Sequence, residues 1–152
     1  LHNVGSMFRT ADAAGVEKLY LCGITGTPPR KEIAKVALGA EQTLLWEYVR
    51  RTSDAVKRLK KEGVHIVALE RTKTSVDYRN LLKSPSVSPF KKGGVRRIYD
   101  ETSVALLVGN EVEGLSPALL KLADAVIHIP MRGKKESLNV SVAFGIAVYA
   151  LL

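Results

Sequence analysis

The chain has 152 residues, of which 46% are hydrophobic and 25% are charged, so it suits one globular domain with a sizeable core. Its formal net charge of +8 favours a polyanionic partner such as nucleic acid, although a basic protein without such a partner has the same charge. The single cysteine, Cys22, excludes an internal disulfide, three scattered histidines predict no metal site, and no apolar run is long enough to span a membrane. The composition therefore predicts a cytoplasmic protein.

Alternating apolar and polar patterns predict helices between short strands. Helices are expected at Val4–Ala14, Lys31–Glu41, Thr52–Glu62, the segment that Ser116 and Pro117 begin, and Val140–Leu152. Strands are expected at Glu17–Cys22, His65–Leu69, Val104–Val108 and Ala125–Ile129. This alternation is typical of an α/β fold with a mostly parallel sheet and helices on both faces.

Several local features refine this pattern. Asn3 is expected to cap the first helix and Gly15 to end it. Trp46 and Tyr48 are interpreted as packing residues rather than as platforms for nucleic-acid bases. The segment Thr72–Val95 is rich in proline, serine and glycine, so it is expected to be a loop or a mobile insertion.

Three stretches combine glycine and polar residues in an otherwise apolar pattern. Residues 3–11 read NVGSMFRTA, residues 107–116 read LVGNEVEGLS, and residues 129–146 read IPMRGKKESLNVSVAFGI. In the third, serine and asparagine stand where a loop enters an apolar helix, and helix capping alone would explain them. The glycine spacing of the second fits neither a dinucleotide-binding fingerprint nor a phosphate-binding loop.

Together and in this order, the three stretches resemble the motifs of the SpoU/TrmH family of SPOUT-class RNA ribose 2′-O-methyltransferases. The resemblance covers the chain from Leu1 to Leu152. It implies a single SPOUT methyltransferase domain with a C-terminal deep trefoil knot, S-adenosylmethionine as cofactor, and a homodimer. Family members place a β-strand before the first motif, so the chain is expected to lack that N-terminal strand.

The resemblance also implies which residues hold the cofactor. Matched position by position, they are Val108, Gly109, Ile129, Met131, Ser137 and Leu138. Most of them follow predicted strands, and open α/β sheets bind ligands at the carboxyl ends of their strands. Gly109 fits because a residue without a Cβ lets a ligand approach the backbone closely. The side chains of Ile129 and Leu138 fit a plain core equally well.

The catalytic set implied by the family is Asn3, Arg9, Glu111, Ser137 and Asn139. A ribose 2′-hydroxyl must be held in line with the methyl group and must lose its proton. The family assigns the proton to the arginine, here Arg9, whereas guanidinium chemistry favours orienting phosphate and ribose; Arg9 is expected to be essential either way. Asn3 and Asn139 would bind ribose or hold the loops, and Glu111 would pair with Arg9 or with an arginine across the dimer.

Basic residues indicate where RNA would bind. Those in or beside the motifs are Arg9, Arg132, Lys134 and Lys135. Further candidates, which would also suit a solvated surface, are Arg50, Arg51, Lys57, Lys60, Lys91, Lys92, Arg96 and Arg97. Each phosphate contact releases counterions, so binding should weaken with salt.

The sequence therefore predicts S-adenosylmethionine-dependent 2′-O-methylation of a ribose in structured RNA. Transfer RNA is favoured over ribosomal RNA because no separate RNA-binding domain is visible. One alternative is a non-catalytic RNA-binding protein of the same fold, but such a protein would not need the five catalytic candidates together. A small-molecule methyltransferase is a second alternative, and the net charge of +8 argues against it.

Overall fold

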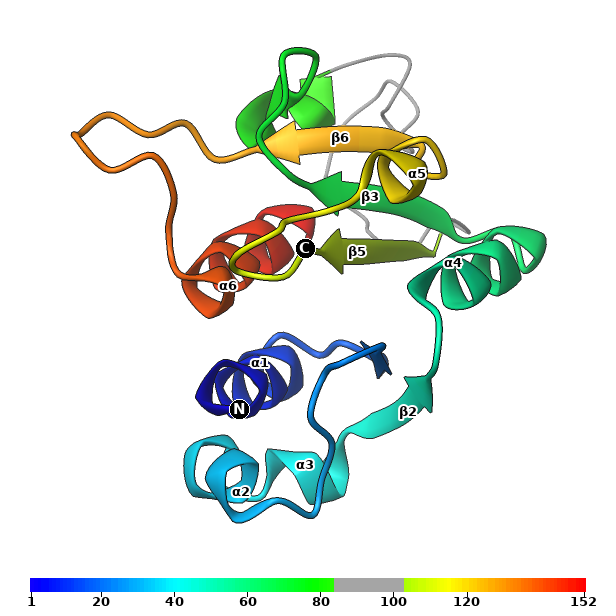
Figure 1. Ribbon diagram of the computed structural model, residues 1–152, viewed down its shortest axis with the longest axis vertical. Helices are drawn as coiled ribbons and strands as arrows, with labels where there is room; N and C mark the ends of the chain where they lie inside the picture. Colours follow the sequence, from blue (N-terminus) through cyan, green and yellow to red (C-terminus); the bar gives the residue numbers. More distant parts are fainter. Residues whose placement is uncertain (84–102) are drawn as a thin grey trace.

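Helices and short strands alternate along the chain, as the apolar pattern predicted (Figure 1). The computed structural model describes residues 1–83 and 103–152. Its helices are α1 (His2–Ala13), α2 (Lys31–Ala37), α3 (Ala40–Thr43), α4 (Thr52–Lys61), the 3-10 helix η1 (Tyr78–Lys83), α5 (Pro117–Leu120) and α6 (Val140–Leu151). Its strands are β1 (Lys18–Cys22), β2 (Leu45–Val49), β3 (His65–Leu69), β4 (Val76–Asp77), β5 (Val104–Val108) and β6 (Ala125–His128).

The strands form two parallel groups flanked by helices. β1 pairs with β2, and the second group has the order β4-β6-β3-β5. β3 lies inside this second group, with His65 opposite Val104 of β5 and Val67 opposite Ala125 of β6. Because β3, β5 and β6 run parallel, the loops that follow them begin at one edge of the sheet. Two of those loops carry the second and third motifs.

Helix α1 organises the larger hydrophobic core. It lies between α2 and α6 (Figure 1), and Phe8, on its buried face, packs in one cluster with Ile33 of α2 and Phe144 of α6. Gly5 permits the close approach of α2, because a Cβ at this position would lie 2.6 Å from the carbonyl oxygen of Ile33. The packing of α1 therefore fixes the place of the first motif, which this helix carries.

Some elements differ from the sequence-based expectations. The helix expected at Lys31–Glu41 is divided into α2 and α3, because Leu38 and Gly39 adopt left-handed φ angles of 53° and 95°. Asn3 does not cap α1: the helix begins at His2, so Asn3 lies in its first turn. Gly15 follows the end of α1 at a φ of 70°, as expected.

Of the two aromatic residues in β2, one packs as expected and the other does not, and the expected loop contains regular structure. Trp46 packs edge-on against Phe8, with ring centroids 6.5 Å apart, which confirms its packing role. Tyr48 is 48% exposed and donates a hydrogen bond to the carbonyl of Gly23 at 2.9 Å. The prediction that Tyr48 packs in the core was therefore wrong. The described part of Thr72–Val95 contains β4 and η1.

The candidates Lys91, Lys92, Arg96 and Arg97 lie outside the described residues. Among the helices that the structure describes, none is long and apolar enough to cross a membrane. Within residues 1–83 and 103–152, no group of three or more histidine, cysteine, aspartate or glutamate residues is arranged to hold a metal ion.

Candidate active site

Asn139 is the residue that joins the three motifs. It precedes α6, and its Oδ1 accepts hydrogen bonds from the backbone N–H of Ser141 at 2.9 Å and from the Ser141 hydroxyl at 2.6 Å. Its Nδ2 donates to Oδ1 of Asn3 at 3.0 Å and to Oε1 of Glu111 at 3.3 Å. One end of the amide therefore caps a helix, while the other end bridges α1 and the loop after β5.

This bridge brings together residues that are distant in the sequence. Asn3 comes from the first turn of α1, Glu111 from the second motif, and Asn139 from the third. Asn139 and Glu111 are exposed, and Asn3 is half-buried. The helix-capping interpretation of the third motif is therefore confirmed for Asn139, but it accounts only for the Oδ1 side of this amide.

Arg9 is exposed, two turns along α1 from Asn3. Among the described residues it takes part in no ion pair. The expected ion pair between Arg9 and Glu111, both of which the structure describes, is not formed, and Glu111 accepts a hydrogen bond from Asn139. Within residues 1–83 and 103–152 no carboxylate neutralises the Arg9 guanidinium, and an exposed guanidinium has the N–H donors that bind an anionic ligand.

The second motif forms a loop that folds back on its own start. The backbone N–H of Gly114 donates to the carbonyl of Asn110 at 2.9 Å, and the Asn110 side chain accepts from the N–H of Val112 at 2.7 Å. A Cβ on Gly109 would lie 2.5 Å from the carbonyl carbon of Gly114. The loop's own backbone therefore requires a glycine at position 109, and the expected approach of a ligand to Gly109 stays a prediction.

Two residues that sequence reasoning missed hold these loops. Glu70 follows β3, and its Oε2 accepts a hydrogen bond from the backbone N–H of Leu115 at 2.9 Å. Arg71 is next in the chain, and its Nη1 donates to the carbonyl of Glu136 at 3.4 Å. The available signal was two adjacent charges directly after a buried strand, at the edge where ligands bind α/β sheets.

The residues matched to cofactor binding occupy different environments. Val108 packs half-buried against the larger core, and Ile129 and Met131 are also half-buried. Ser137 is exposed, and Leu138 is 40% exposed. The structure therefore places an uncovered apolar side chain in the third motif, beside polar residues.

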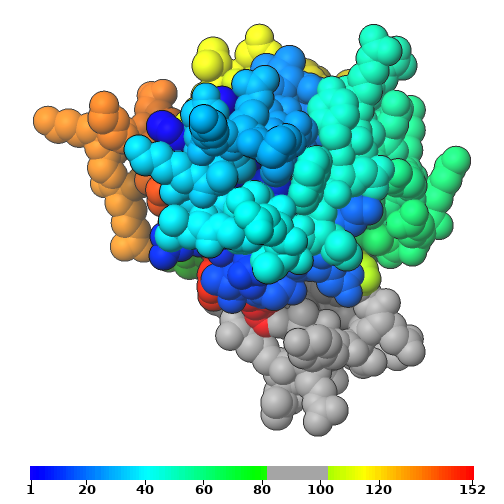
Figure 2. Space-filling model, turned by 90° about the horizontal axis from the view of Figure 1, so that it is seen from below, coloured from blue at the N-terminus to red at the C-terminus, as the bar shows by residue number. Residues whose placement is uncertain are grey.

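The loop between Ile129 and Asn139 carries the basic candidates of the third motif. It extends away from the rest of the molecule in Figure 1 and stands off one side of it, in orange, in Figure 2. Arg132, Lys134 and Lys135 are all exposed on it. A projecting loop with three cations near Asn139 is suited to contact a polyanion.

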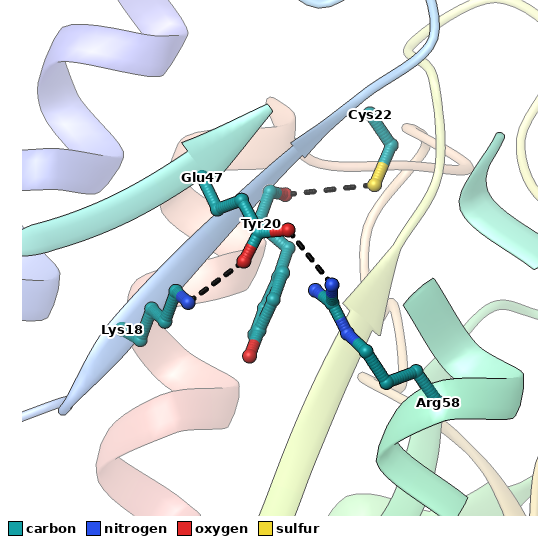
Figure 3. Close-up of polar contacts among 5 residues, drawn as sticks. All are labelled: Lys18, Tyr20, Cys22, Glu47 and Arg58. Atoms are coloured by element: carbon teal, nitrogen blue, oxygen red, sulfur yellow. Dashed lines mark hydrogen bonds and ion pairs between the residues drawn. The ribbon is translucent and has the colours of Figure 1, made fainter. Parts of the chain in front are cut away.

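A second polar cluster lies on β1, β2 and α4 (Figure 3). Glu47 accepts from the Lys18 ammonium and from Nη1 of Arg58, both at 2.8 Å. The Arg58 guanidinium and, next, the Lys18 ammonium lower the pKa of the Glu47 carboxyl below its ordinary 4.5. Both cations also lie over the ring of Tyr20, at 4.9 Å for Lys18 and 5.4 Å for Arg58. These charges are satisfied within the fold.

The remaining basic candidates on and before α4 divide into two kinds. Lys60 is bound within the protein, because its ammonium lies 2.6 Å from Oδ1 of Asp124 and 2.9 Å from the carbonyl of Leu122. Arg50, Arg51 and Lys57 are exposed. Of the four, Lys60 is therefore the least suited to bind RNA phosphates.

The parallel α/β fold and the joined motif residues define a protein of the SpoU class. Residues 1–149 match the SpoU rRNA Methylase family, and the chain belongs to this family. It is 36% identical to a tRNA (guanosine(18)-2′-O)-methyltransferase of Aquifex aeolicus, over 97% of this chain and 62% of that protein. It is 35% identical to a 23S rRNA (guanosine(2553)-2′-O)-methyltransferase of Bacillus subtilis, over 98% of this chain and 52% of that protein.

The fold is also that of solved structures. An AdoMet-bound rRNA methyltransferase from Sinorhizobium meliloti matches with a TM-score of 0.80 at 31% identity, over 99% of this chain and 51% of that one. The chain spans 62% and 52% of the length of the two curated relatives named above. The chain therefore shares the family's fold and spans part of each relative's length.

Proposed function

We propose that this chain is the methyltransferase domain of an enzyme that transfers a methyl group to a ribose 2′-oxygen in structured RNA. The observation that carries the proposal is the Asn139 bridge, which joins Asn3 and Glu111 from the other two motifs. An exposed Arg9 follows Asn3 on the same helix. Family relatives named as tRNA and 23S rRNA 2′-O-methyltransferases support the same reaction.

S-adenosylmethionine is the proposed methyl donor, as in the AdoMet-bound relative. The residues that would hold it are Val108, Gly109, Ile129, Met131, Ser137 and Leu138. Their chemistry fits an adenosine, because a 40% exposed Leu138 offers apolar contact while main-chain groups of the two loops offer hydrogen bonds. When bound, this cofactor supplies a methyl group attached to a positively charged sulfur.

The protein's own residues would then prepare the acceptor. Arg9 is placed to bind an RNA phosphate through paired N–H donors and so to orient the neighbouring ribose. Asn139 would hold Glu111 and Asn3 in fixed positions around that ribose. Its hydrogen bond from the Ser141 N–H caps α6 and so fixes the start of this helix. The proton of the 2′-hydroxyl would pass to the RNA phosphate that Arg9 binds, because a guanidinium has only N–H donors and no lone pair to accept a proton.

The proposal extends to architecture and partners. It includes a C-terminal trefoil knot, a cytoplasmic location in keeping with the free thiol of Cys22, and a homodimer. Two large side chains on α6, Val142 and Tyr149, are 51% and 53% exposed, which supports burial of this helix against a second copy. Transfer RNA is the first proposed substrate and ribosomal RNA the second.

The test uses radiolabelled S-adenosylmethionine with two unmodified RNA pools, transfer RNA and ribosomal RNA. Label that enters one pool, together with a bond resistant to alkali at the modified site, is the expected result and selects the substrate. Cofactor binding without label in either pool would favour an RNA-binding protein instead. Absence of cofactor binding would contradict the proposed reaction.

A further inference from the structure

The strand β3 ends between the two loops that carry the second and third motifs. β5 pairs with it on one side and β6 on the other. The two residues that follow β3 are charged, Glu70 and Arg71, and each reaches one of the two loops. Neither residue belongs to one of the three motifs, although each contacts a loop that carries one.

Glu70 is bound to the sheet through its backbone and to the second motif through its side chain. Its own backbone N–H donates to the carbonyl of Ile127 in β6 at 2.9 Å, which ties it to the sheet. Its Oε2 accepts from the N–H of Leu115, a residue only 7% exposed. Its Oε1 accepts from the N–H of Arg71 at 3.2 Å. Both carboxylate oxygens are therefore used.

The contact between Glu70 and the loop is close enough to fix the loop's path. Gly114 adopts a φ of +65°, and a Cβ there would lie 2.6 Å from Oε2 of Glu70. Gly114 in turn rests on Gly109, where the loop leaves β5. The Glu70 carboxylate thus fixes the position of the loop at Gly114 and Leu115. Glu111, which accepts a hydrogen bond from Asn139, lies between β5 and these residues.

Arg71 reaches the third motif. Its guanidinium donates to the carbonyl of Glu136 at 3.4 Å, close to Ser137 and Leu138 in the sequence. The contact is longer than the one made by Glu70, and Arg71 is exposed. Its effect on the loop should therefore be smaller than that of Glu70.

We propose that Glu70 and Arg71 are positioning residues that set the spacing of the two cofactor loops. Glu70 acts through the Leu115 N–H on residues 109–115, and Arg71 acts through the Glu136 carbonyl on residues 130–139. The inference rests on the proposed function, because it takes these loops to hold S-adenosylmethionine.

The experiment compares Glu70→Ala with Glu70→Gln in the whole chain. Loss of the carboxylate should raise the Kd for S-adenosylmethionine about ten- to a hundredfold, because small displacements of a binding loop are costly. The fall in kcat at saturating cofactor should be smaller. Glu70→Gln should recover most of the affinity, since its amide oxygen can still accept from Leu115. Calorimetry measures the Kd, and Glu17→Ala, which removes an exposed carboxylate outside both loops, is the control.

A second readout does not depend on activity. The amide proton of Leu115 should exchange with solvent slowly in the unsubstituted protein and in Glu70→Gln, and faster in Glu70→Ala. If the unsubstituted protein binds no S-adenosylmethionine, the proposed function fails, while this exchange rate still tests the loop contact. Unchanged exchange at Leu115 in Glu70→Ala would overturn the inference, as would unchanged cofactor affinity in a protein that binds it.

Arg71→Ala keeps the inference testable if Glu70→Ala does not fold. Arg71 is exposed, so its removal should leave the fold intact. A rise of a few-fold in the Kd for S-adenosylmethionine is expected, with Lys73→Ala, an exposed cation two residues further on, unchanged. Equal affinities in Arg71→Ala and Lys73→Ala would contradict a role for Arg71.

Discussion

Two polar clusters of this protein use their charges in opposite ways. In the cluster of Figure 3, Glu47 is bound by Lys18 and Arg58, and both cations also lie over Tyr20. In the motif cluster, Asn139 bridges Asn3 and Glu111 through one amide, and no described carboxylate pairs with Arg9. The first cluster is complete within the fold, whereas the second keeps a cation available.

This difference separates charges that support the fold from charges that await a ligand. Exposed ion pairs contribute little to stability, because solvent screens them and long side chains must be ordered. An exposed arginine such as Arg9, which no described carboxylate pairs with, can bind a phosphate. Substitutions should therefore affect stability slightly in the first cluster and activity strongly in the second.

Arg9→Ala should have the largest effect on activity. Removal of a charged donor that orients the reacting groups is expected to lower kcat about 100- to 1,000-fold, while alanine on an exposed helix face leaves the melting temperature unchanged. Arg58→Ala is the matched control, because it removes an arginine that Glu47 already neutralises. Steady-state methyl transfer at saturating RNA and cofactor measures kcat for both variants. Near-normal turnover in Arg9→Ala would exclude a role in the reaction.

Substitutions of Asn139 should have the next largest effect, and two of them separate its role as the cap of α6 from its role as a bridge to Asn3 and Glu111. Asn139→Ala removes both, so we expect a loss of about 1 kcal/mol in the free energy of unfolding together with a loss of activity. Asn139→Asp keeps an oxygen that can cap α6, but it replaces the donor that faces Glu111 and Asn3 with an acceptor. Its stability should resemble that of the unsubstituted protein, and its activity should fall. Urea unfolding and methyl transfer measure the two, and full activity in Asn139→Asp would reduce Asn139 to a helix cap.

Much of the fold was predictable because apolar spacing is a local property. β3 and β5 have the predicted bounds, and Ser116 caps α5 as expected. The division of α2 from α3 was not predicted, since Leu38 is not a residue that normally adopts a left-handed φ. β2, which pairs in parallel with β1, was also missed, although its sequence LWEYV is rich in residues that favour strands.

The motifs pointed to residues that lie together in the candidate site, whose function stays a prediction. Asn3, Glu111 and Asn139 were found by resemblance and do lie together. The contact between Glu111 and Asn139 rather than Arg9 depends on where the loop after β5 turns back, and spacing alone does not give that path. Glu70 stayed hidden for the same reason, because its partner is a backbone N–H, which every residue except proline carries.

The smallest effect is expected at Glu47, and pH reveals it. The Arg58 and Lys18 contacts lower the pKa of Glu47 below 4.5 in the folded protein. A carboxyl with a depressed pKa in the folded state stabilises it above the unfolded pKa, and this contribution is lost as pH falls through the folded pKa. Glu47→Gln should therefore be slightly less stable than the unsubstituted protein at pH 7, and the difference should shrink below about pH 4.5.

Urea midpoints measured from pH 7 to pH 3 test this pH dependence of Glu47→Gln. Added salt should reduce the difference in stability at pH 7, because both cations are partly exposed. A difference that stayed constant with pH would mean that Glu47 contributes through its packing rather than through its charge, and the contrast between the two clusters would then lose its electrostatic basis.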